Sequence, residues 1–210
     1  MKSLPNRDPG RGDKTPVKYE LGGHWHFSSL GRWALLAILA GGMVVMVLAF
    51  FLGSVAREML RGPGEFNFSI GLTALPIFLG IIAITIILHE AVHALAFLFA
   101  GGKPHFGFKL IGRFFPVVYA SAPGLIFPRN RYLLVGLAPF VTLTLLFLVT
   151  GMVVSSDGIA LMALMVMAMN VAGSIGDMMM IGKVRQHRRE TLFEDTADGF
   201  NWYYPPTPNL

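Results

Sequence analysis

Hydrophobic positions along the chain gather into four long runs separated by polar segments. Each run has about 20 or more mostly apolar residues, which is the length that a helix needs to cross the hydrocarbon core of a bilayer. We therefore expect four transmembrane helices, over residues 33–55, 70–99, 132–154 and 159–181. The first, third and fourth runs contain no Asp, Glu, Lys or Arg before Asp177.

The two ends of the chain have a different composition from these runs. Residues 1–32 are rich in Pro, Gly and charge, which is typical of a disordered tail, and residues 182–210 form a second polar, Pro-rich tail. We therefore expect a basic tail over 1–32, a membrane-embedded domain over 33–181 and a polar C-terminal tail over 182–210.

The segment 101–131 between the second and third runs is more patterned than a plain connection. Phe106, Phe108 and Leu110 alternate with a glycine and a lysine, which predicts a short β-hairpin in this loop. The loop has five basic residues and no acidic one, so it either lies along the membrane surface or handles substrate. The expected fold class is thus an all-α membrane protein, a bundle of about four transmembrane helices with a hairpin-like cytoplasmic loop.

Composition supports a membrane protein and excludes several kinds of chemistry. The chain of 210 residues is 54% hydrophobic and 14% charged, whereas a soluble domain is about one quarter charged. It has no Cys, which excludes disulfides, a catalytic thiol and a thiolate metal site. The net charge of +5 does not indicate nucleic-acid binding, because the basic residues are distributed around the apolar runs.

The positions of Lys and Arg predict how the chain crosses the membrane. Six lie in 1–32, two in 56–69, five in 100–131 and four after residue 181. With four spans, the three more basic segments fall on one side, which should be the cytoplasmic side. We expect a multi-pass protein of the cell membrane with both termini in the cytoplasm.

The second run contains the ionisable sequence "LHEAVHAL" at residues 88–95. Unpaired ionisable groups cost several kcal/mol each in an apolar medium, so these need partners. Residues four apart on a helix lie on one face, so His89 and His93 can bind one metal ion, with Glu90 about 100° away around the axis. The H-E-x-x-H spacing is typical of zinc hydrolases, in which the two histidines bind Zn²⁺ and the glutamate is the general base. Alternatively, neighbouring helices or water could satisfy all three side chains.

A catalytic zinc ion usually has a third protein ligand, and Asp177 is the strongest candidate. It is the other carboxylate within a predicted span, and its expected depth matches that of the two histidines. Asp157 lies in the opposite turn, and the acidic residues of the C-terminal tail are expected in water. Asp177 could instead pair with basic residues near the end of its span, and His105 is an alternative ligand. Those basic residues are Lys183 and Arg185.

Asn170 lies seven residues before Asp177, on almost the same face of the helix. Its amide could stabilise an oxyanion or bind the substrate backbone, or it could make a hydrogen bond between helices. Gly173 and Gly176 are expected to let the fourth span pack closely against the second.

The sequences "HEAVHAL" and "NVAGSIGD" resemble those of membrane proteins grouped as putative zincin peptidases, within a domain of unknown function. The resemblance covers about residues 70–185, and the chain is more distantly similar to the site-2 protease class. In that class the late motif is an Asn, a Pro and an Asp-Gly, with the Asp as the third zinc ligand. Here Met178 follows Asp177 and no Pro follows Asn170.

The expected function is that of a membrane-embedded zinc metallopeptidase acting on a membrane or membrane-associated protein. Zn²⁺ is held by His89, His93 and Asp177, and Glu90 removes a proton from the attacking water. The substrate enters from the cytoplasmic side or through a lateral gap, and a strand of the 101–131 loop could pair with it. The alternative is a non-proteolytic transporter or metal sensor, which should have ionisable residues all along a path across the membrane. An inactive scaffold is disfavoured by the intact glutamate.

Overall fold

The computed structural model describes residues 19–63, 74–111 and 115–204. The expectation of a disordered tail therefore lies, for residues 1–18, outside the described residues.

The four predicted apolar runs are helical over their described residues, and residues 70–73 of the second run lie outside the described residues. The runs correspond to α1 (Arg32–Arg61), α2 (Ala74–Phe99), α3 (Arg129–Val153) and the pair α4 (Asp157–Gly173) and α5 (Ile175–Arg185). By length and composition, all four segments could cross a membrane. The predicted membrane-spanning helices are thus confirmed to that extent.

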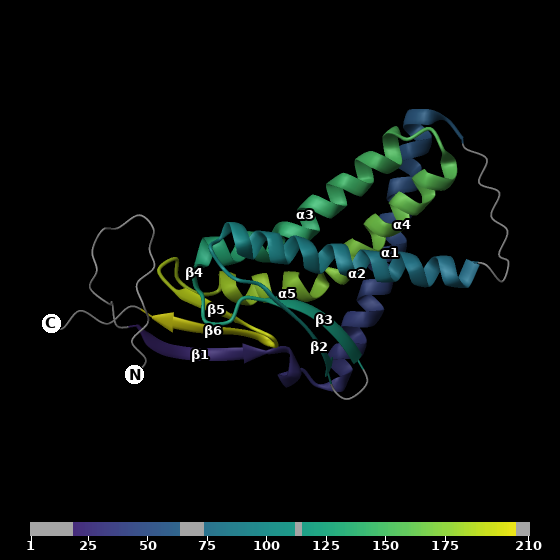
Figure 1. Ribbon diagram of the computed structural model, residues 1–210. Coiled ribbons are helices and arrows are strands. Elements are labelled where there is room, and N and C mark those ends of the chain that lie inside the picture. The colour runs from purple at the N-terminus through teal and green to yellow at the C-terminus, as the bar shows by residue number, and fades with distance from the viewer. Residues whose placement is uncertain (1–18, 64–73, 112–114, 205–210) are drawn as a thin grey trace.

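The fourth segment bends at Ser174, between α4 and α5. The Ser174 amide donates to the Asn170 carbonyl at 2.9 Å and the Ser174 hydroxyl donates to the same oxygen at 2.8 Å, so the chain stays helix-like through the junction. In Figure 1, α5 runs toward the yellow strands and packs against α3, whereas α4 turns away toward α1. The bend therefore brings the beginning of α5 toward the sheet end of the molecule.

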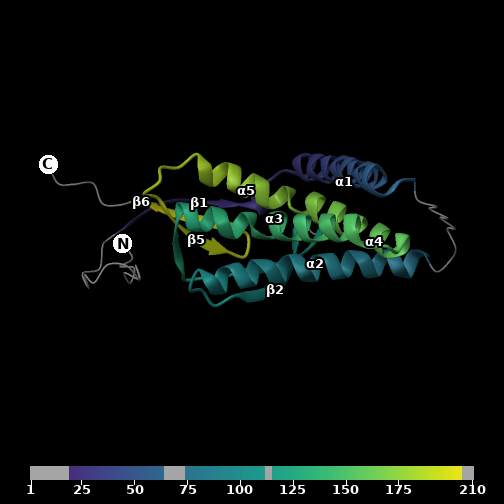
Figure 2. The ribbon, with the colours of Figure 1, turned by 90° about the horizontal axis from the view of Figure 1, so that it is seen from above.

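Helix α4 is the centre of the helical bundle. It packs against α1 and α3, and α2 packs against α3 and α4. Figure 2 shows α1 and α2 on opposite sides of α4, and over their described residues these two helices hardly touch. Most apolar side chains of α1 and α2 face outward, as expected for helices in lipid.

An arginine from α1 binds the backbone at the turn between α3 and α4. Arg57 is 4% exposed and donates to the carbonyls of Gly151 at 2.7 Å and Val154 at 3.1 Å. It also pairs with Asp157 in the first turn of α4, at 2.7 Å. These bonds satisfy carbonyl groups that the end of α3 would otherwise leave without partners.

The predicted hairpin of the 101–131 loop is present. Strands β2 (His105–Ile111) and β3 (Phe115–Ser121) pair antiparallel in a two-stranded sheet, with His105 opposite Ser121. Phe106, Phe108 and Leu110 point to one exposed side of β2.

A second sheet corrects the all-α prediction. Its antiparallel strands lie in the order β1 (Glu20–His26), β6 (Gly199–Tyr204), β5 (Leu192–Thr196) and β4 (Ile126–Pro128). Strand β1 falls within the expected disordered tail, and β5 and β6 fall within the expected polar C-terminal tail. The fold is therefore mainly helical with two small antiparallel sheets.

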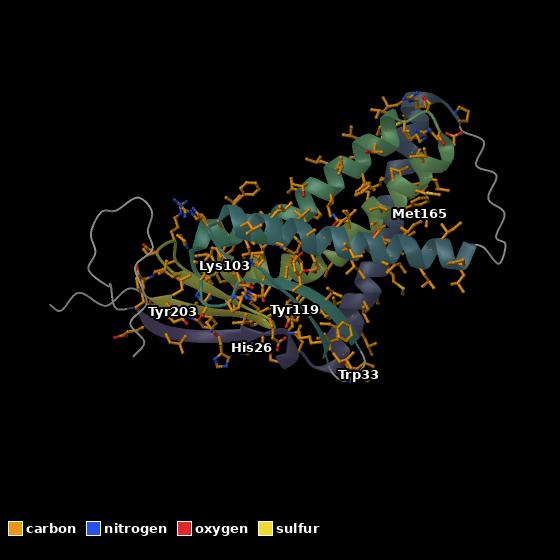
Figure 3. All side chains as sticks on the ribbon, in the orientation of Figure 1. His26, Trp33, Lys103, Tyr119, Met165 and Tyr203 are labelled. Carbon is orange, nitrogen blue, oxygen red and sulfur yellow. The ribbon has the colours of Figure 1, made fainter. Side chains whose placement is uncertain are left out.

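Aromatic packing attaches this sheet to the helices. The Tyr132 ring of α3 stacks on Phe193 of β5, with ring centroids 5.6 Å apart, and Phe200 of β6 meets both rings. Phe97 of α2 and Phe127 of β4 complete this buried cluster. In Figure 3, nitrogen and oxygen atoms gather around the sheets, near Tyr203, while carbon covers most of the helices around Met165.

Candidate metal centre

The structure brings His89, His93 and Asp177 together. The two histidines are one turn apart on the same face of α2, with ring centroids 5.0 Å apart. Asp177 Oδ2, from the first turn of α5, lies 3.0 Å from His89 Nε2 and 3.3 Å from His93 Nε2. Zinc with nitrogen and oxygen ligands at about 2.0–2.1 Å places tetrahedral ligand atoms roughly 3.3 Å apart. The Asp177 oxygen is therefore at zinc-ligand spacing from both histidine nitrogens, and all three donor atoms lie within 4.8 Å of one another.

The other ring nitrogens of the histidines decide which atoms can bind a metal. His89 Nδ1 lies 3.0 Å from Asn170 Oδ1, and His93 Nδ1 lies 3.2 Å from the Val135 carbonyl oxygen. Both partners are acceptors, so each Nδ1 carries the proton and each Nε2 presents a lone pair. Unless both rings take up a second proton, these lone pairs face a carboxylate oxygen, which is unfavourable without a cation between them. The residues present therefore fit zinc.

Glu90 is held beside this centre by the hairpin. Its Oε2 accepts a hydrogen bond from the backbone amide of Ala120 in β3, at 2.5 Å. Because Ala120 directs its amide away from β2, this edge of β3 faces the centre. Alternate residues of a strand share an edge, so the backbone groups of Val118 point the same way.

Asn170 does not have the geometry of an oxyanion donor. It is 1% exposed, its Oδ1 accepts from His89, and its Nδ2 donates to the Pro139 carbonyl at 3.2 Å and to Thr144 Oγ1 at 3.1 Å. Both amide protons are thus engaged within the bundle. This geometry supports the alternative interpretation, a hydrogen bond between helices, and it orients His89.

The two alternatives considered for the third ligand find no support. In the part of the chain that the structure describes, the Asp177 carboxylate contacts the Nε2 atoms of the two histidines and forms no ion pair with Lys183 or Arg185. His105 is exposed at the start of β2, where its Nδ1 lies 3.0 Å from the Lys103 carbonyl oxygen. It is not part of the cluster.

A large pocket opens from the metal centre. It has a volume of about 720 Å³ and is lined by α1, α2, β3, the α4–α5 junction and the turn between β5 and β6. Gly173 lies on its wall, and a Cβ added there would meet no atom within 4 Å. A Cβ added at Gly176 would meet the Phe27 ring at 3.5 Å. The expected close packing of these glycines against α2 is therefore wrong.

A carboxylate that the sequence did not predict lies beside the centre. Asp195 of β5 was expected in water with the other acids of the tail, but it is 6% exposed and lines the pocket. Burial raises the pKa of its carboxyl to about 7. The sequence does contain a signal for the hairpin that carries Asp195. Asp198-Gly199 follows one aromatic-containing segment and precedes another, and Asp-Gly is typical of hairpin turns.

Fold and site together define a mainly helical protein with four segments of membrane-crossing length and a candidate zinc centre. A family model described as "putative zincin peptidase" matches residues 82–192, just over half of the chain, and the chain belongs to this family. The matched range contains His89, His93 and Asp177, and the family implies zinc as the metal. Neither a curated protein nor a solved structure matches the chain.

Replacing Asp177 by Ala should lower zinc affinity by about 100-fold or more, because changes to groups that only orient ligands already cost 10–100-fold. Competition with a chelator measures the affinity. The matched control is a Lys183→Ala, Arg185→Ala variant, in which affinity should be unchanged. An Asp177→Ala protein that binds zinc as tightly as wild type would exclude Asp177 as a ligand.

Proposed function

We propose that the protein is a membrane-embedded zinc metallopeptidase that cleaves membrane or membrane-associated proteins. One observation carries this proposal: a carboxylate oxygen lies at zinc-ligand spacing from two imidazole Nε2 atoms, with a second carboxylate, that of Glu90, beside them. Membership of the zincin peptidase family supports metallopeptidase activity.

Glu90 is the proposed general base. When bound, zinc would polarise the water and the scissile carbonyl. Among the hydrogen bonds of the described residues, only Oε2 of Glu90 is engaged, by the Ala120 amide, so Oε1 is available to water. Glu90 accepts the proton as the water oxygen bonds to the carbonyl carbon. It then delivers this proton to the leaving nitrogen as the C–N bond breaks.

The edge of β3 is the proposed binding strand for the substrate. Residues Val117–Ala120 line the pocket, and the Val118 backbone groups point to the same edge as the Ala120 amide. An extended peptide added to this edge would present its carbonyls to the metal centre. The exposed apolar row Phe106, Phe108 and Leu110 of β2 suits the membrane surface, so the two interpretations of this hairpin are compatible.

A substrate from the bilayer would reach the centre between α1 and α2. These helices lie on opposite sides of α4 and hardly touch (Figure 2), and both contribute apolar side chains to the pocket that contains the centre. On α1 the residues that line the pocket recur at helical spacing, as Leu35, Ile38, Leu39, Gly42, Met43 and Met46.

Orientation in the membrane follows from the basic residues. Of the described Lys and Arg residues, those in the hairpin, at the start of α3 and after Ile181 lie near the sheets. By the positive-inside rule, the sheets lie on the cytoplasmic side of the cell membrane. A transporter gains no support, since the ionisable residues in the described helices gather near their ends or at the metal centre.

The activity is tested by incubating purified, zinc-loaded protein in detergent with a peptide mixture and identifying new termini by mass spectrometry. The Glu90→Gln protein is the blank. New termini are expected with wild type and not with the blank. If wild-type protein with one bound zinc per chain produces none, the proposed function is wrong.

A Gly173→Leu substitution should selectively impair cleavage of a membrane-embedded substrate. The new side chain would fill open space in the pocket without meeting the surrounding protein at its Cβ. We expect about tenfold slower cleavage, a change of about 1.4 kcal/mol in activation free energy, for a peptide fused to an apolar helix in liposomes. The same cleavage sequence as a short soluble peptide should change less.

The matched control is Gly182→Leu. Gly182 lies in α5, is exposed, and also has nothing within 4 Å of an added Cβ, but it does not line the pocket. If both leucine variants slow the two substrates equally, the route between α1 and α2 is wrong.

A further inference from the structure

Asp195 makes two hydrogen bonds that link the C-terminal sheet to the two halves of the candidate centre. Its Oδ2 accepts from the Ala122 amide at 3.2 Å, and its Oδ1 accepts from the Tyr132 hydroxyl at 2.8 Å. Asp195 is 6% exposed and Tyr132 is 2% exposed, so neither bond is shared with bulk solvent.

The first bond leads to the proposed base. Ala122 directly follows β3, two residues after Ala120, whose amide binds Glu90 Oε2. Holding the Ala122 amide fixes the end of this strand, and with it the position of the amide that orients Glu90.

The second bond leads to a proposed metal ligand. Tyr132 lies in α3, one turn before Val135, and the Val135 carbonyl accepts from His93 Nδ1. The Tyr132 ring is fixed by stacking on Phe193, the residue two positions before Asp195 on the same face of β5. Strand β5 thus holds this turn of α3 by both a ring contact and a hydrogen bond.

Burying a carboxylate at this position costs free energy. Burial is unfavourable for the charged form and raises the pKa of Asp195 to about 7, while the hydrogen bonds from Tyr132 and Ala122 oppose the shift. Asp177 is also near enough to raise it. An apolar residue would pack here without this cost, but it could accept neither bond. The ionised carboxylate accepts both donors at once, which an amide cannot do in the same orientation.

We propose that Asp195 is a positioning residue, which holds the strand that orients Glu90 and the helix turn that orients His93 in one fixed relation. Strand β5 therefore contributes a positioning residue to the metal centre, although it lies outside the predicted membrane-embedded domain over 33–181. The catalytic part of this inference rests on the proposed peptidase function, whereas its metal-binding part does not.

The test compares Asp195→Asn with Glu194→Gln, a matched control on the same strand. Glu194 points to the other face of β5 and also binds a tyrosine, Tyr203, at 2.5 Å, with a second bond from Asn201 at 3.2 Å. General weakening of the sheet should affect both variants. Only Asp195→Asn should alter the metal centre.

Metal affinity provides a measurement that does not depend on activity. We expect Asp195→Asn to weaken zinc binding by about tenfold, the lower end of the effect known for residues that orient metal ligands. The absorption spectrum of the Co²⁺-substituted protein should also change. Glu194→Gln should alter neither. If the two variants have the same affinity and the same spectrum, the proposal is wrong.

Kinetics and a double variant complete the test. For peptide hydrolysis, Asp195→Asn should lower kcat by about tenfold while KM stays within about twofold, because the proposed role of Asp195 is to position Glu90 and His93 and not to bind substrate. Tyr132→Phe should reproduce part of the loss in metal affinity. The double variant should then lose less than the product of the two single losses, because both remove the same bond. Fully multiplicative losses would overturn the proposed link. If the wild-type protein shows no hydrolysis but the variants still lose zinc affinity as expected, only the peptidase function is refuted.

Discussion

The Glu90→Gln protein is expected to keep one zinc ion per chain and to hydrolyse peptide about 1000-fold more slowly than wild type, within the 10²–10⁴-fold contribution of general bases. Gln has the same shape, and its Oε1 can still accept the Ala120 amide, which binds Glu90 at 2.5 Å. An amide cannot accept the proton of the attacking water. The variant therefore separates proton transfer from metal binding.

Zinc content by elemental analysis and initial rates on the same preparation measure both quantities. A Glu90→Asp variant is a useful companion, because it keeps a carboxylate but shortens its reach, and it should fall between wild type and Glu90→Gln. Hydrolysis by Glu90→Gln at more than a tenth of the wild-type rate would rule out Glu90 as the base.

Substituting both His89 and His93 by Ala should remove zinc almost completely, with a loss of affinity well beyond the 10–100-fold that orienting groups contribute. Two of the three donor atoms are lost, and the remaining Asp177 oxygen cannot hold the ion alone. Hydrolysis should disappear with the metal. The helix itself should persist, because Ala favours helical structure.

His105→Ala is the matched control, since His105 is exposed and lies outside the cluster. It should retain stoichiometric zinc. Retention of one zinc per chain by the double alanine variant would refute the proposed site, and loss of zinc in His105→Ala would make His105 the ligand instead.

Features encoded within short stretches of sequence could be predicted. The four apolar runs and the hairpin at 101–131 depend on local composition and periodicity, and all are present. The spacing of His89 and His93 fixes their common face, because any α-helix would do so. Asp177 was found near them because depth in a membrane restricts where a buried carboxylate can lie.

Features that depend on distant pairing were missed. Strand β5 pairs with β4 and β6, and β6 pairs with β1, which lies more than 170 residues earlier in the chain. A polar tail gives no local sign of such partners, so Asp195 was expected in water. The bonds of Asn170 to His89, Pro139 and Thr144 likewise require knowledge of which helices are neighbours.

Titration of zinc into protein from which a chelator has removed the metal, with peptide hydrolysis followed at each step, tests the central claim most directly. The proposed centre predicts no hydrolysis without metal, a linear rise as zinc is added, and a maximum at one zinc ion per chain. Hydrolysis at the full rate by the metal-free protein, or no hydrolysis after one equivalent has bound, would contradict the assignment of this protein as a zinc metallopeptidase.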